Sequence, residues 1–77
     1  MDMSDRHQAS DLVGLLSASL GDEKARDAVQ TAVAKLGLDE QALDREQALA
    51  VLEQIAGKPG LVGIAARFAK TRVHLKW

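Results

Sequence analysis

Three glycines divide this 77-residue chain into short segments, and they constrain its fold more than any other feature. Gly21, Gly37 and Gly57 each follow a stretch in which apolar residues recur every three or four positions. That spacing places the apolar side chains on one face of a helix, and a glycine just beyond a helix favours the left-handed conformation that ends it. After Gly37, Leu38 can pack back on Val33, an apolar contact typical of such an ending. The pattern predicts three helices that end before these glycines.

The first two helices are expected over residues 7–20 and 23–36. Ser4 or Ser10 is the expected N-terminal cap of the first helix, because a serine hydroxyl can accept a hydrogen bond from a free backbone N–H group there. The second helix has the clearest one-face pattern, built largely from alanine and valine. Small residues on that face allow a neighbouring helix to approach closely.

The third helix is expected over residues 45–56 and has a clear start signal. Asp44 followed by Gln47 three positions later forms a capping box, in which each side chain accepts a hydrogen bond from the other residue's backbone. Residues 38–43 then form a short connector, for which one turn of helix around residues 41–43 is expected.

A fourth helix is expected over residues 61–70, after a turn at residues 58–60 that contains proline and glycine. Gly63 beside Ala66 would allow a close helix crossing. The face expected to be buried consists of Leu61, Ile64, Ala65 and Phe68. Residues 71–77 alternate basic and apolar side chains, which is also a strand pattern. They are a helix continuation, an extended tail or an edge strand that pairs with another chain, and we favour the helix.

The predicted fold class is all-α, a compact four-helix bundle or orthogonal helical array. The whole chain, residues 1–77, is one small domain, with residues 1–6 expected to be disordered. Its core must be built from Leu, Val, Ile and Ala, because the only aromatic residues are Phe68 and Trp77. The absence of cysteine excludes disulfides and thiolate metal sites. No apolar run reaches the roughly 20 residues of a membrane span, and a cytoplasmic location is expected.

The sequence argues against an enzyme. It has no cysteine or tyrosine, and its two histidines, His7 and His74, stand near opposite ends of the chain without the spacing of a known catalytic triad. The carboxylates of Glu23 and Asp27 could share a helix face, but basic residues beside them indicate a solvated helix start rather than an acid–base pair. We expect no catalytic residue, no cofactor, no metal and no small-molecule substrate.

Charge is divided unevenly along the chain. Residues 1–53 hold all 11 acidic residues and five of the 10 basic ones, a net −6, whereas residues 54–77 hold the other five basic residues and no acid, so the halves sum to the net charge of −1. A basic, partly apolar end favours contact with an acidic partner. We therefore expect a non-catalytic protein–protein interaction or oligomerisation module, with a protein partner or a second copy as a homo-oligomer. The expected partner-binding residues are Arg67, Lys70, Arg72, His74, Leu75 and Trp77.

Two alternatives use the same end of the chain. Residues 52–72 loosely match a helix-turn-helix, with Arg67, Lys70 and Thr71 pointing outward for nucleic acid, although the proline in the turn and the acidic body oppose it. Residues 60–77 also resemble an amphipathic helix that binds anionic membrane surfaces. The expected burial of Phe68 in the bundle argues against the membrane alternative, so neither is favoured.

Overall fold

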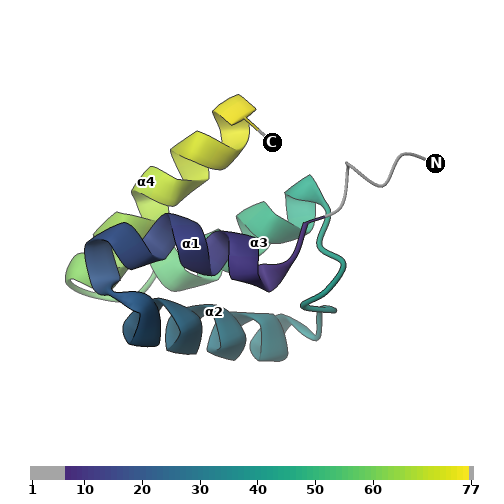
Figure 1. Cartoon of the computed structure of the whole chain (residues 1–77), viewed down its shortest axis with the longest axis horizontal. Coiled ribbons are helices and arrows are strands. Elements are labelled where there is room, and N and C mark those ends of the chain that lie inside the picture. The colour runs from purple at the N-terminus through teal and green to yellow at the C-terminus, as the bar shows by residue number, and fades with distance from the viewer. Residues whose placement is uncertain (1–6, 77) are drawn as a thin grey trace.

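The protein is an all-α globule of four helices, as predicted. In the computed structural model, residues 7–76 are described, with side chains as far as residue 75. The helices are α1 (Ala9–Leu20), α2 (Asp22–Leu36), α3 (Arg45–Ala56) and α4 (Leu61–Lys76). Helix α1 packs on α2 and α4, and α3 packs on α2 and α4, so each helix has two main neighbours (Figure 1). The prediction of disorder for residues 1–6 lies outside the described residues.

The core is aliphatic and lies where the four helices meet. It contains no buried polar or charged side chain among residues 7–75. Full burial of one such aliphatic side chain contributes about 1.5–3 kcal/mol to folding. Eight large side chains are completely or almost completely buried: Leu12, Leu16, Val29, Leu43, Val51, Leu52, Ile55 and Val73.

The start of α1 is tied to the connector between α2 and α3. The backbone N–H groups of His7 and Leu43 each donate to the other residue's carbonyl oxygen at 2.7 Å. The predicted helical turn at residues 41–43 is therefore wrong: the chain makes a tight turn after Asp39, and Leu43 is extended and fully buried. The predicted cap at Ser10 is also wrong, because the helix begins one residue earlier, at Ala9. Ser4 lies outside the described residues.

The predicted end of α2 and start of α3 are confirmed. Gly37 is left-handed, with φ of 66°, and the N–H of Leu38 donates to the carbonyl oxygen of Val33 at 3.1 Å. Asp44 accepts a hydrogen bond from the Gln47 N–H at 2.7 Å, and the Gln47 side chain accepts one from the Asp44 N–H at 3.0 Å. These local hydrogen bonds satisfy backbone groups that helix ends otherwise leave open.

The turn between α3 and α4 lies at residues 58–60, as predicted, but its left-handed glycine is not the predicted one. Gly57 is right-handed, with φ of −74°, and the left-handed residue of this turn is Gly60, with φ of 77°. The N–H of Lys58 donates back to the carbonyl oxygen of Ile55 at 2.9 Å, so α3 closes with one further tight turn. The reversal of the chain follows at Gly60.

Helix α4 extends to Lys76, which confirms helix continuation for residues 71–76 and leaves Trp77 outside the described residues. The extended-tail and edge-strand alternatives are wrong for these residues. Figure 1 shows that the C-terminal half of α4 rises past the other helices. This part of the helix therefore offers surface that no other helix covers.

Candidate functional site

Helix α4 has two apolar faces, one buried and one exposed. The buried face consists of small residues and one valine: Gly63, Ala65, Ala66, Ala69 and Val73. The exposed face carries larger side chains, with exposed fractions of 57% for Leu61, 49% for Ile64, 69% for Phe68 and 79% for Leu75. We call these four residues the outer stripe. Elsewhere in residues 7–75, the exposed large apolar side chain is Leu36, at 38%.

The prediction that α4 buries Leu61, Ile64 and Phe68 is wrong, and the reason is the packing at Gly63. A Cβ atom at Gly63 would overlap the carbonyl oxygen of Lys58 in the turn and lie 3.1 Å from that of Ala56, so the first turn of α4 lies directly against the preceding turn and the last residue of α3. Backbones this close leave space for alanine side chains between the helices but not for leucine or phenylalanine. The larger side chains are therefore on the solvent side.

The outer stripe has the spacing of a coiled-coil seam. Leu61, Ile64, Phe68, Thr71 and Leu75 are separated by three, four, three and four positions. This is the alternation of the a and d positions of a heptad repeat, which keeps side chains in line along one side of a helix. The Thr71 hydroxyl donates to a carbonyl oxygen one turn earlier at 3.3 Å, so its polar group is satisfied within α4.

Basic side chains border the outer stripe on both sides. In the same heptad, Arg67 and His74 occupy g positions and Arg72 an e position, the two positions that flank a coiled-coil seam. All three are exposed. The guanidinium of Arg45, from α3, donates to the carbonyl oxygen of His74 at 2.9 Å and adds positive charge near the same end. The other e position beside the stripe is Ala65, which is buried, so the basic border runs from Arg67 to His74 along the C-terminal part of the stripe. Helix α4 contains no Asp or Glu.

Lys70 is used inside the molecule. Its ammonium group donates to the carboxylate of Glu53 on α3 at 2.6 Å. This hydrogen bond, together with the positive charge of Lys70, holds the pKa of the Glu53 carboxyl below its ordinary value of 4.5. Lys70 therefore joins α4 to α3 and does not belong to the basic border.

The structure brings together four of the six predicted partner-binding residues beside or within the outer stripe: Arg67, Arg72, His74 and Leu75. Lys70 is paired with Glu53, and Trp77 lies outside the described residues. Sequence reasoning missed the other three members of the stripe, because it assigned them to the core. The signal that could have found them is the continuous heptad spacing from Leu61 to Leu75.

Other kinds of site have little support in the described part of the chain. Residues 7–76 contain no group of three His, Cys, Asp or Glu side chains that could hold a metal ion. A depression between α1, α2 and the connector is lined both by exposed polar side chains such as Ser10, Gln30 and Glu40 and by the apolar side chains of Ala9, Val13 and Val29. No described helix combines the length and apolar character required to cross a membrane.

Comparisons with known protein families, with curated proteins and with solved structures find no match to this chain, so its candidate site is defined by its own geometry.

Proposed function

We propose that this chain is a non-catalytic protein–protein interaction module that binds its partner through the outer stripe of α4. The observation that carries the proposal is the exposure of four large apolar side chains, between 49% and 79%, along one straight line of a single helix. Contiguous exposed apolar surface bordered by polar residues is typical of protein interaction sites.

The size of the apolar contribution supports the proposal. Full burial of each such side chain contributes about 1.5–3 kcal/mol, so covering the exposed parts of four of them yields on the order of 5 kcal/mol. The core is formed by other residues, including Val73 on the opposite face of α4. The outer stripe is therefore available for binding without loss of the fold.

The nucleic-acid alternative is less well supported by this arrangement. A recognition helix inserts its exposed side chains into a groove lined by polar base edges and phosphates. The exposed line of α4 would place Ile64 and Phe68 there, and Lys70, one of the expected phosphate contacts, is already paired with Glu53. An apolar surface on a protein partner complements Ile64 and Phe68 better than a nucleic-acid groove does.

A peptide-display selection against the immobilised full chain tests the proposal. The probe is a library of random peptides in a helix-favouring framework. We expect enriched peptides that bind the wild type and the Gln30→Ser control on α2 equally, and that bind Phe68→Ser roughly tenfold more weakly, as expected for loss of about 1.4 kcal/mol of apolar contact. Failure to enrich any peptide, or enrichment of peptides that ignore Phe68→Ser, would contradict the proposed function.

A further inference from the structure

We propose that the partner of the outer stripe is an amphipathic helix whose apolar seam is flanked by Glu or Asp, and not a second copy of this chain. This inference rests on the proposed function and identifies the chemistry of the partner. It follows from three features of α4: the length of the stripe, the sign of its border and the absence of a complementary surface on the described part of the molecule.

The length of the stripe defines the length of the partner. Leu61 and Leu75 are 14 positions apart, which corresponds to about 21 Å along an α-helix at 1.5 Å per residue. A partner helix of about two heptads covers that distance and can place its own a and d residues between those of α4. A narrow a/d line suits a single partner helix. Because Phe68 is exposed, its burial no longer argues against a membrane surface, and the vesicle measurement below tests that alternative.

The border determines the charge of the partner. Positions e and g of paired helices face each other across the seam, and charges there select the partner. On α4 these positions hold Arg67, Arg72 and His74, and the guanidinium of Arg45 lies beside His74. Glutamate or aspartate at the facing positions of the partner would therefore be attracted on both sides of the seam.

A second copy fits this border poorly. Two α4 helices paired in parallel would place Arg67 of one copy against Arg72 of the other, and antiparallel pairing would bring like g positions together. Like charges across a seam disfavour pairing.

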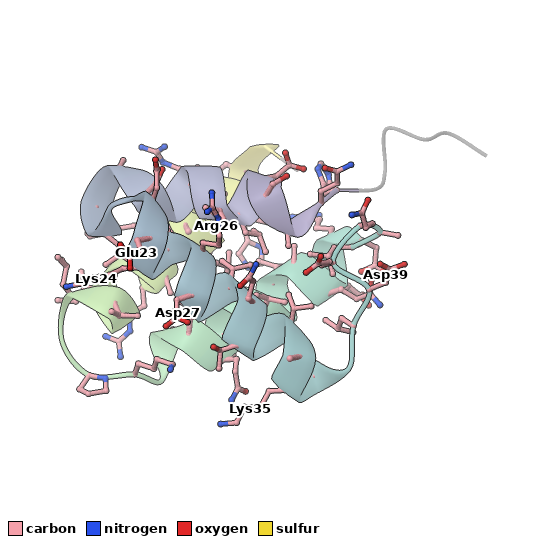
Figure 2. The ribbon with its side chains drawn as sticks, turned by 60° about the horizontal axis from the view of Figure 1, so that its bottom comes forward. Glu23, Lys24, Arg26, Asp27, Lys35 and Asp39 are labelled. Atoms are coloured by element: carbon pink, nitrogen blue, oxygen red, sulfur yellow. The ribbon has the colours of Figure 1, made fainter. Side chains whose placement is uncertain are left out.

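The acidic residues of a neighbouring copy do not solve this problem. Figure 2 shows that charged side chains of both signs line α2, with Glu23, Lys24, Arg26, Asp27 and Lys35 labelled. Beyond Leu36 at the end of α2, the described surface outside α4 has no exposed large apolar side chain to cover the stripe. A second copy that offered the acidic side chains of α2 would therefore also offer basic ones and would leave the outer stripe uncovered.

Three labelled helical peptides of about 16 residues test the inference by fluorescence anisotropy with the full chain. They share leucine at the a and d positions and carry Glu, Gln or Lys at every e and g position. Each exposed ion pair changes an affinity by roughly 1.5- to 5-fold, so we expect the Glu peptide to bind about tenfold tighter than the Gln peptide and the Lys peptide to bind weakest. The preference should shrink to about twofold at roughly 0.5 M salt, because exposed pairs are screened.

Variants of the chain separate the contribution of charge to peptide binding from that of apolar contact. Arg67→Gln combined with Arg72→Gln should reduce the Glu-over-Gln preference to about twofold, while Phe68→Ser should weaken both peptides and Gln30→Ser neither. Equal binding of the Glu and Gln peptides, still lost in Phe68→Ser, would overturn this inference and leave the proposed function standing. No binding of any peptide would overturn both.

Two further measurements address the other occupants of the stripe. We expect the chain to sediment as a monomer at low and high salt and to remain in the supernatant when vesicles of phosphatidylcholine with about one quarter phosphatidylserine are pelleted. A dimer lost in Phe68→Ser would show that a second copy covers the stripe. Vesicle binding lost in the same variant would show that a membrane does. Either result would overturn the acidic-helix proposal.

Discussion

Gly63 controls which face of α4 is buried, and replacing it with alanine tests that explanation. A Cβ atom there would overlap the backbone carbonyl oxygen of Lys58 and lie 3.1 Å from that of Ala56, both closer than the 3.4 Å at which ordinary contact begins. Both atoms belong to the backbone, so relief requires the first turn of α4 to move away from Lys58 in the turn and from Ala56 at the end of α3. Gly63 is not among the glycines with positive φ, so the expected effect is steric.

The loss of stability in Gly63→Ala can be estimated from two opposing effects, the steric overlap of the added methyl group and the higher helix propensity of alanine. Adding a methyl group to a closely packed site costs about 1–3 kcal/mol, and contact with a rigid backbone places Gly63→Ala at or above the upper end. Alanine is favoured over glycine in a helix by about 1 kcal/mol. The net loss is about 2 kcal/mol from a total stability of roughly 4–12 kcal/mol for a domain of this length, which lowers Tm by roughly 8–16 °C.

Gly14→Ala is the matched control. Gly14 is exposed in the middle of α1, and a Cβ atom there would meet nothing within 4 Å. Only the higher helix propensity of alanine relative to glycine remains, so Gly14→Ala should raise the free energy of unfolding by about 0.5–1 kcal/mol and Tm by roughly 2–8 °C. Thermal and urea unfolding followed by circular dichroism measures both variants. If Gly63→Ala is stabilised as much as Gly14→Ala, the close approach of α4 to α3 is wrong, and with it the reason for the exposed stripe.

Three other predictions follow from single contacts. Leu52→Ala, at a fully buried position, should lower the free energy of unfolding by about 2–5 kcal/mol in urea melts. Phe68→Ala, at an exposed position, should change it by less than about 0.5 kcal/mol. Equal losses in the two variants would place Phe68 in the core. Asp44→Ala removes the cap of α3 and should cost about 1 kcal/mol in the same melts, and no loss would contradict the capping box. The pKa of Glu53, measured by NMR titration, should be below 4.5 in the wild type and return to its ordinary value in Lys70→Met. Since the pKa of Glu53 is lower in the folded state than in the unfolded state, its contribution to stability is present above the unfolded pKa and lost as pH falls through the folded pKa. A pKa that is unchanged in Lys70→Met would refute the pairing of Lys70 with Glu53.

The sequence was informative where structure is decided by neighbouring residues. The left-handed end at Gly37 and the capping box of Asp44 and Gln47 depend on hydrogen bonds across three to five positions, and both are present. The length of α4 could also be predicted, because no glycine or proline interrupts residues 64–76. Gly57 was misassigned, because the turn that follows offers a second glycine, Gly60, which takes the left-handed position.

The sequence was misleading where packing decides. Periodicity shows that α4 has apolar residues on two sides, but it cannot show which side faces the bundle. Size alone favoured Phe68 for the core, yet the close contact at Gly63 selects the alanine face. The pairing of Lys70 with Glu53 joins residues 17 positions apart on different helices, so it could not be read from local spacing. The candidate site was therefore only partly predictable, its basic border more readily than its apolar stripe.

The most direct test of the central claim is to locate the binding surface residue by residue. Nitrogen-15-labelled full-length chain is titrated with the Glu-flanked peptide, and amide chemical shifts are recorded. We predict that the largest changes fall on the exposed side of α4, at Ile64, Phe68 and Arg72, with little change at Gln30 on α2. Changes confined to α2, or saturating binding that leaves α4 unchanged, would contradict the claim that the outer stripe is the binding surface.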